Sequence, residues 1–413
     1  MRETRFKAGV FLIEGLNSFA TTYYFWYFYF FMQKQFGYGD EPDLILAALN
    51  GFVVMIAAWW GGRFAQRAGY FTALKLGFSV MAIALLVGAQ LHSAGAHIVV
   101  MLVAAIGMCF TWSTLEALTS EGETPAGLQR MVGLYNIIWA GTGAVAYFTG
   151  GAMLEKLGLK SMFYVPCGLF VAQLGLTFWL ELEAMKISGP TGSADILGGE
   201  SRGSESKDSP AKMPALPARS IELNLRPIAR ARAFLRMAWL ANPFAYIAIN
   251  TLIAVMPGVA QRFGLSTTLA GYCCSVWCFA RLGAFFGLYF WSGWHYRFRW
   301  LLASYLALVA TFAVILVVPN LAVLVVAQLV FGGALGLIYS SSLFYSMDVG
   351  ETKGVHGGIH EAAIGLGNFA GPAVGAASLH FLPQYTNSGV MAVSALLLCG
   401  LGGLLAVRRA TKT

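Results

Sequence analysis

Apolar runs alternate with short polar segments along most of the chain. A helix of about 20 residues crosses the hydrocarbon core of a bilayer, so each long apolar run predicts one membrane-spanning helix. Twelve such helices are expected, at residues 8–32, 43–65, 72–92, 97–118, 130–152, 161–182, 237–261, 267–290, 299–318, 321–346, 355–380 and 388–408.

One polar segment is much longer than the others. Residues 183–236 are rich in Gly, Ser and Pro, a composition typical of disordered linkers. We therefore expect three parts: an N-terminal bundle of six helices over 1–182, a cytoplasmic and largely disordered linker over 183–236, and a C-terminal bundle of six helices over 237–413.

Two distant segments, 112–150 and 339–375, share a pattern. In each, a turn with an acidic residue and Gly-Glu-Thr precedes two glycines that are 17 residues apart, Gly133 and Gly150 in the first segment and Gly358 and Gly375 in the second. This register predicts a duplicated chain, in which the second six helices repeat the first six.

Composition places most of this chain in lipid. It is 58% hydrophobic and 11% charged, whereas soluble domains carry about 25% charged residues. The net charge of +8 is spread between the apolar runs, so we expect a lipid bilayer and no nucleic acid as partner. The six cysteines all fall inside apolar runs without ligand spacing, and neither a disulfide nor a metal site is expected.

Basic residues are unevenly divided between the two sides of the predicted membrane. With the N-terminus inside, 22 of the 27 Lys and Arg residues fall on the inner side. Because positive charge accumulates on the cytoplasmic side, both termini are expected in the cytoplasm of a multi-pass protein of the cell (inner) membrane.

The turn after the second span points to a family. From Gly62 to Gly69 it reads Gly-Arg-Phe-Ala-Gln-Arg-Ala-Gly, which is similar to the G-x-L-A-D-R-x-G loop of the major facilitator superfamily, with Gln66 in place of the usual Asp. Two six-helix halves, a central linker and a parallel repeat resemble the same family along almost the whole chain. The resemblance implies an all-α integral membrane protein with twelve helices in two pseudo-symmetric bundles.

The resemblance also implies a cytoplasmic gate, in which arginines of such turns pair with acids at the inner ends of the fourth or tenth span. The matching pairs are Arg67 with Glu116 or Glu121, and Arg297 with Asp348. The alternative is that Arg63 and Arg67 only anchor the turn on the cytoplasmic side. Because Gln66 replaces the usual Asp of the loop, half of the family's network of gate ion pairs is not implied here.

Polar residues recur at helical spacing on some spans and are nearly absent from others. The third, sixth, ninth and twelfth spans have apolar middles and can face lipid, whereas the first, seventh, eighth, tenth and eleventh carry polar stripes. The expected substrate and proton path comprises Glu14, Asn17, Thr21, Tyr24, Asn136, Asn250, Trp277, Arg281, Tyr339, Ser342, His360, Glu361 and Asn368.

Three ionisable residues lie at membrane depth: Glu14, Arg281 and Glu361. Such residues mark transport paths by default because an unpaired charge in lipid is costly. The two acids are candidates for proton handling, and the guanidinium of Arg281 matches a carboxylate or phosphate. The alternative is a structural ion pair between Arg281 and one of the acids, and His360 is more often a packing residue than a proton carrier.

Motifs that would name an activity are absent. Residues 367–376 are similar to the family's antiporter motif, but that motif belongs in the fifth span, where it is missing. No nucleotide-binding, metalloprotease or serine-hydrolase motif appears, so we expect neither an enzyme nor a cofactor.

Three functions remain open. The preferred one is a monomeric, proton-coupled symporter that moves a small polar or anionic organic solute by alternating access. The second is a proton-driven exporter of lipophilic compounds or lipids. The third is a receptor or assembly factor without transport, which would have no need of membrane-buried acids.

Overall fold

The computed structural model describes the backbone at residues 2–120, 125–188, 218–348 and 353–410, and the side chains of most of these. The described residues form helices and no strand, which confirms the predicted all-α class. Helix is expected here because lipid offers no hydrogen-bond partner to the backbone, so each segment must satisfy its own.

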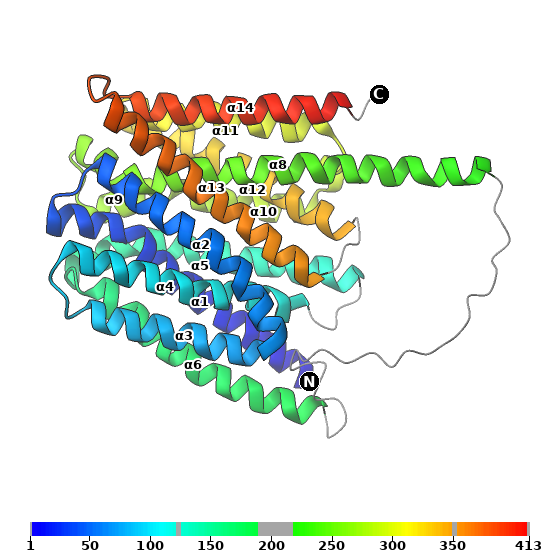
Figure 1. Ribbon diagram of the computed structural model, residues 1–413, viewed down its shortest axis with the longest axis horizontal. Helices are drawn as coiled ribbons and strands as arrows, with labels where there is room; N and C mark the ends of the chain where they lie inside the picture. The colour runs from blue at the N-terminus through cyan, green and yellow to red at the C-terminus, as the bar shows by residue number, and fades with distance from the viewer. Residues whose placement is uncertain (1, 121–124, 189–217, 349–352, 411–413) are drawn as a thin grey trace.

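The helices follow the predicted spans in order (Figure 1). They are α1 (Arg2–Phe36), α2 (Asp40–Ala68), α3 (Tyr70–Gly88), α4 (Ala94–Ser120), α5 (Pro125–Lys156), α6 (Ser161–Ser188), α8 (Ala218–Arg262), α9 (Thr267–Cys274), α10 (Val276–Phe290), the short η1 (Ser292–Trp294), α11 (Phe298–Val317), α12 (Leu321–Asp348), α13 (Lys353–Phe381) and α14 (Ser388–Ala410).

The eighth span differs from the prediction of one continuous helix. It is interrupted at Ser275, between α9 and α10. Gln328 of α12 donates a hydrogen bond from Nε2 to the carbonyl oxygen of Cys273, at 2.8 Å. That carbonyl is satisfied by a side chain from another helix, which lets the backbone depart from helical geometry in the membrane.

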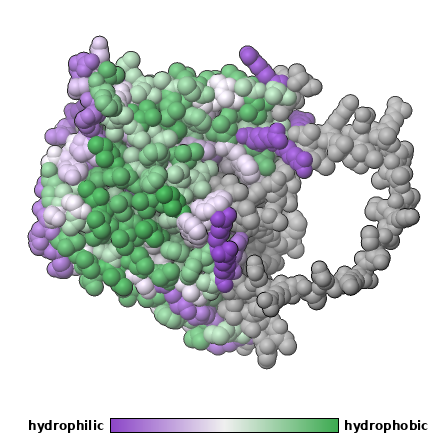
Figure 2. Space-filling view, in the orientation of Figure 1, coloured by the Kyte–Doolittle hydropathy of each residue, from purple (hydrophilic) through white to green (hydrophobic). Residues whose placement is uncertain are grey.

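Eleven spans of the described chain are long and apolar enough to cross a membrane, with α9 and α10 counted together. Of the twelve predicted spans, the first, α1, is not among these eleven, because its polar stripe and its many tyrosines lower its hydropathy. Apolar side chains cover the middle of the molecular surface, and hydrophilic ones gather at its two ends (Figure 2). This is the distribution that a bilayer requires.

The helices before and after residues 189–217 pack mainly among themselves, and the two groups meet along two interfaces. One joins α2 to α13, and the other joins α5 to α9 and α10. In terms of the predicted spans, the first interface joins the second span to the eleventh, and the other joins the fifth to the eighth. Exchanging the two halves therefore maps one interface onto the other. The glycine pairs of the predicted repeat lie on α5 and α13, which are equivalent helices under that exchange.

Both chain ends lie at the same end of the bundle (Figure 1). There α1 begins and α14 ends, and we call this the inner end and the opposite one the outer end. Residues 189–217, the middle of the predicted linker, lie outside the described residues; helix is present on both sides of them, in α6 and α8.

At the inner end, Gly69 has φ of 93° between α2 and α3, a left-handed conformation that favours glycine.

Candidate functional site

A cavity of about 1070 Å3, including the part open to solvent, lies between the two groups of helices. It is lined from α1, α2, α4 and α5 on one side and from α8, α10 and α13 on the other. Its walls consist of Ser18, Thr21, Thr22, Phe25, Trp26, Tyr29, Asn50, Val54, Ala58, Met108, Cys109, Trp112, Ser113, Trp139, Gly143, Tyr246, Ile249, Asn250, Ile253, Arg281, Ile364 and Asn368.

Arg281 supplies the positive charge of this wall. Its side chain is 4% exposed, and its guanidinium carbon lies 4.5 Å from the centre of the Trp139 ring and 5.0 Å from that of Trp277. Its Nε has no hydrogen-bond partner, and no carboxylate among the described residues forms an ion pair with it. The predicted structural ion pair is therefore not present among the residues that the structure describes.

Asn136 fixes the ring on which Arg281 rests. It lies one helical turn before Trp139 on α5, and its Oδ1 accepts a hydrogen bond from the indole Nε1 at 2.9 Å. Trp139 also packs against two rings of the second half: its ring centre lies 6.0 Å from that of Phe285 and 5.5 Å from that of Tyr339. Trp139 thus bridges the two halves, and Asn136 acts behind it rather than in the cavity wall.

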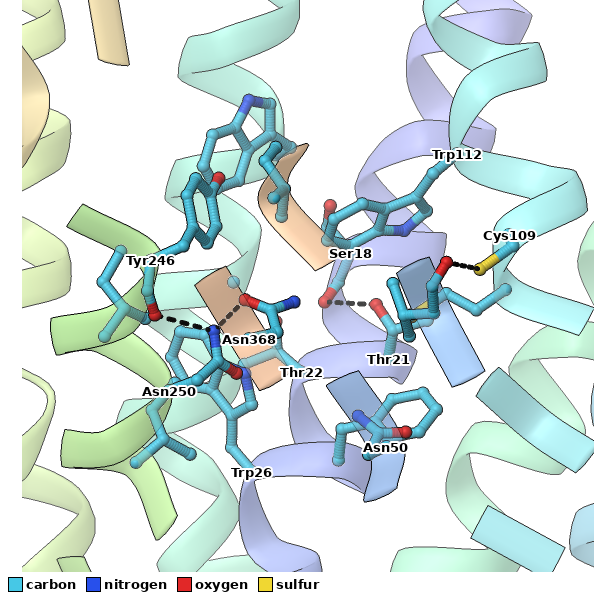
Figure 3. Close-up of a pocket in the computed structure, with 18 of the residues that line it drawn as sticks. Ser18, Thr21, Thr22, Trp26, Asn50, Cys109, Trp112, Tyr246, Asn250 and Asn368 are labelled. Atoms are coloured by element: carbon cyan, nitrogen blue, oxygen red, sulfur yellow. Dashed lines mark hydrogen bonds between the residues drawn. The ribbon is translucent and has the colours of Figure 1, made fainter. Parts of the chain in front are cut away.

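A pair of amides forms the opposite part of the site (Figure 3). Asn250 of α8 donates a hydrogen bond to Oδ1 of Asn368 on α13 and another to the backbone carbonyl of Tyr246. The figure shows the hydroxyl side chains of α1 between this pair and Trp112. Oδ1 of Asn50 and Nε1 of Trp112, both in the wall, have no partner within the described chain. Such groups are available to a bound solute.

The polar stripe of α1 divides between two environments. Thr21 and Ser18 lie in the cavity wall, whereas Glu14 is 1% exposed and does not line the cavity. Ser18 donates a hydrogen bond from Oγ to Oε1 of Glu14 at 3.0 Å, so this acid is one hydrogen bond from the wall. Asn17 donates to Oγ1 of Thr111 at 3.4 Å, inside the first group of helices.

The other predicted path residues lie in several places. Tyr24 packs inside the first group of helices, against the ring of Phe163 at 6.0 Å. Trp277 and Tyr339 support the Arg281–Trp139 stack from behind the wall, and Ser342 is fully buried away from it. The side chains of His360 and Glu361 lie outside the described residues, although α13 includes both positions.

Several wall residues escaped the sequence analysis, chiefly Asn50, Trp112 and Trp139. Asn50 is the one amide within the apolar run of α2, a signal that could have identified it. The two tryptophans gave no such signal, because an aromatic residue in an apolar span is indistinguishable from a packing residue by pattern alone.

Among the described residues, no ion pair joins the members of the predicted inner gate. Arg67 is exposed and forms no ion pair with Glu116 or any other described residue. Its neighbours in the turn, Gly62 and Gln66, are half-buried, and Arg63 rests on the ring of Trp59 at 3.8 Å.

The arginine of the second half of the predicted gate is also without an ion pair among the described residues. Arg297 is exposed and likewise has no ion-pair partner within the described chain. Glu121 and the side chain of Asp348 lie outside the described residues.

The outer end is joined across both interfaces. Four polar contacts link the halves there: Arg262 Nη1 with Asp40 Oδ2 at 4.0 Å, His380 Nδ1 with Glu41 Oε1 at 3.0 Å, Gln33 Nε2 with Gln261 Oε1 at 3.1 Å, and the Thr268 amide with Glu155 Oε2 at 2.9 Å. These contacts join the two halves at the outer end. No group of three potential metal ligands occurs in the part of the chain that was described.

Comparison with known proteins gives the same architecture. The chain is similar to the crystal structure of the nucleoside transporter NupG, at 14% identity and a TM-score of 0.63, over 98% of this chain and 98% of that one. It is also similar to the human organic anion transporter MFSD10, at 16% identity and a TM-score of 0.62, over 97% and 99% of the two chains.

A third similar structure is a bacterial homologue of the human lysosomal transporter Spinster, inward-facing and unoccupied, at 16% identity and a TM-score of 0.59, over 99% and 94%. At these identities the likeness is one of fold. No curated protein sequence matches the chain significantly. The sequence model of the Major Facilitator Superfamily, however, matches residues 10–372, nearly the whole length. The chain belongs to the major facilitator superfamily.

Proposed function

We propose that this protein is a secondary transporter that carries a small organic anion through the central cavity by alternating access. The observation that supports the proposal is Arg281, a buried guanidinium in the cavity wall with no carboxylate partner among the described residues. Arginine stays protonated in proteins, so its charge must be balanced by something other than deprotonation.

The energetics favour an anion as that balancing group. A charge at membrane depth costs several kcal/mol unless it is paired or hydrated. Contact with the faces of Trp139 and Trp277 returns about 2 kcal/mol per ring at a desolvated site, which offsets part of this cost. A carboxylate or phosphate of the solute would supply the remainder through charge-assisted hydrogen bonds to the fork of donors.

The rest of the wall indicates what the anion carries besides its charge. Aromatic rings from α1, α4, α5 and α8 line the cavity, and the Asn250–Asn368 pair adds amide donors and acceptors. Sites of this kind bury an apolar body and orient it with a few polar groups. The expected solute is therefore an organic anion with a flat or apolar body rather than an inorganic ion.

Alternating access is supported by the difference between the two ends of the molecule. The outer end has polar contacts across the halves, and the inner-gate arginines are exposed without ion pairs in the described chain. This pattern corresponds to a state in which the cavity is closed from outside. One of the similar solved structures is an inward-facing transporter.

The proposal includes coupling of solute transport to protons through Glu14 or Glu361. Glu14 touches the wall through Ser18, and Glu361 lies on α13 three residues before the wall residue Ile364. Replacing either acid by Gln removes a titratable group with little change of shape. If Glu14→Gln and Glu361→Gln both concentrate solute normally under a pH gradient, coupling through these acids is wrong.

The transport proposal is tested by uptake into proteoliposomes from a panel of organic anions, matched neutral analogues and cations. Wild-type protein should take up at least one anion and prefer it to its neutral analogue. Arg281→Lys keeps the charge but loses the fork, so uptake should weaken, and Arg281→Gln should abolish it. Arg63→Gln is the matched control, because Arg63 also rests on a tryptophan but lies outside the cavity. Equal uptake by Arg281→Gln and wild type would refute the anion site.

An exporter of lipophilic compounds is the second candidate, and the aromatic share of the cavity wall favours it. The same vesicles distinguish the two. Extrusion of a neutral lipophilic dye that does not depend on Arg281 supports export, whereas dependence on Arg281 together with preference for anions supports the first proposal.

A further inference from the structure

Asp43 is a buried acid near the outer end that the proposed mechanism has not used. It lies in the first turns of α2, and its side chain is 1% exposed. Its backbone amide donates to the carbonyl of Gly39 at 3.1 Å, but its Oδ1 has no hydrogen-bond partner in the described chain. It lies on the same helix as Asp40, which belongs to the outer closure.

The groups next to Asp43 on α1, α2 and α8 do not neutralise it. Tyr29 of α1, which lines the cavity, lies near Asp43 but carries no positive charge. Asp40, three residues earlier on α2, adds a second negative charge. Arg262 of α8 is directed at Asp40, at 4.0 Å, and forms no ion pair with Asp43. In the part of the chain that the structure describes, Asp43 therefore has no cation of its own.

Two histidines on the other helices packed against α2 complete the surroundings. His380 of α13 contacts Glu41 at 3.0 Å. His97 of α4 packs among the rings of Phe31 and Phe36. Neither is an ion-pair partner of Asp43.

An ionised carboxylate would be costly in this position. Removing a carboxylate ion from water without a partner costs several kcal/mol, whereas the neutral acid costs far less. The N-terminus of α2 offsets only a small part of this cost for a negative charge, and the charge of Asp40 opposes it. The closed outer end is therefore compatible with neutral Asp43, and ionisation favours an end that lets water reach it.

We propose that Asp43 binds a proton from the outer solution before the outer end closes, and that this protonation is a condition of closure. Bulk water delivers the proton to a carboxylate oxygen, and the proton returns to the outer solution when the end reopens. Protonation and closure then favour each other by the same free energy. The inference rests on alternating access in the proposed function, but it concerns the conformation of the empty protein.

Hydrogen–deuterium exchange of the substrate-free, full-length protein tests this, because it reads the closure directly. The informative amides are those of residues 40–50 on α2 and 371–381 on α13, which pack together at the outer end. After correction for the intrinsic pH dependence of exchange, wild type should be protected at about pH 5 and exchange about tenfold faster at about pH 8. Asp43→Asn should stay protected at both.

The His380–Glu41 contact needs a control, because a protonated His380 would also strengthen closure at low pH. His380→Gln and Glu41→Gln should lower protection slightly and keep most of the pH dependence. If His380→Gln removes that dependence while Asp43→Asn keeps it, the proposal is overturned. It is also overturned if wild type shows no dependence.

Two further variants keep the result unambiguous. Asp43→Leu is also neutral but larger and apolar, so it should behave as Asp43→Asn does if the protein tolerates its size, and a thermal unfolding curve shows whether either variant is folded. Arg281→Gln should retain the full pH response of the outer end even where anion uptake is lost. If the anion proposal fails, the exchange experiment still tests the role of Asp43. If the Asp43 proposal fails, the uptake experiment still tests the anion site.

Discussion

The two interfaces between the halves occupy equivalent places in the repeat but are built differently. Where α2 meets α13, backbones touch: a side chain at Gly51 would collide with the backbone of Asn368, and one at Gly365 with that of Met55. Where α5 meets α9 and α10, a side chain at Gly151 would likewise collide with the backbone of Thr267, and stacked rings add to the contact, as in Phe148 on Tyr272 with centres 4.4 Å apart. The two interfaces thus share their place in the predicted repeat but differ in the side chains that pack there.

The difference matters for function because each interface carries one candidate charge. The interface of α5 with α9 and α10 holds Arg281 against Trp139, whereas α2, the helix that meets α13, carries the buried Asp43 three residues after Asp40 of the outer ion pair. Small residues permit close approach of helices, and rings supply polarisable surfaces for a cation. We therefore expect changes at the first interface to alter solute affinity, and changes at the second to alter closure.

The largest effect is expected from Gly51→Ala. Its Cβ would meet the backbone of α13, which cannot move aside as a flexible side chain can. Overpacking costs about 1–3 kcal/mol, so the ratio of outer-closed to outer-open protein should fall by up to about 100-fold. Exchange of residues 371–381 would measure this. Gly168→Ala on α6, where the added methyl meets open space, should change nothing; equal behaviour of the two variants would contradict the backbone contact.

Trp139→Ala should have the next largest effect, and on affinity rather than on closure. Arg281 would lose its closest ring, a contact worth about 2 kcal/mol at a desolvated site. The KM for the best anion of the uptake panel should rise about 30-fold. Trp59→Ala removes the ring beneath Arg63 and should leave KM unchanged. If both variants raise KM alike, the cavity stack is not the anion site.

Asn136→Ala should weaken the same site less, because it acts through Trp139. The lost hydrogen bond to the indole is worth about 1 kcal/mol, so KM should rise about fivefold. Thr149→Ala is the control on the same helix, since it removes a local hydrogen bond to the Val145 carbonyl. Combined with Trp139→Ala, Asn136→Ala should add nothing; an additive effect would show that Asn136 has another role.

Glu41→Gln should have the smallest effect. The side chains of Glu41 and His380 are 38% and 67% exposed, and exposed ion pairs contribute about 0–1 kcal/mol. Protection of the outer end should therefore fall by less than about fivefold, and less still at high salt, where exposed charges are screened. A loss comparable to that of Gly51→Ala would mean that charge, rather than backbone contact, holds this interface closed.

Much of the fold could be read from the sequence because its cause is local. A span needs about 20 apolar residues, and a backbone in lipid must be helical, so hydropathy predicted the spans and the turn from Gly62 to Gly69 indicated the family. The break at Ser275 could not be predicted in this way. It depends on Gln328, which reaches Cys273 from a helix some 50 residues later.

The candidate site could be predicted only in part, for a similar reason. Thr21, Asn250, Arg281 and Asn368 stood out as polar residues in apolar spans and lie in the cavity wall. Glu14 stood out equally but lies behind the wall, because a polar stripe does not say which neighbour it faces.

Asp43 shows the limit most clearly. At the edge of a predicted span, an acid is indistinguishable by sequence from any loop residue beside water. Its burial follows from the helices that pack around α2. The sequence alone therefore determined the number, order and polarity of the helices, since these depend on the chemistry of each segment against lipid. Only the tertiary structure decided which polar groups share a cavity and which lose their water, because both depend on the helices packed around them.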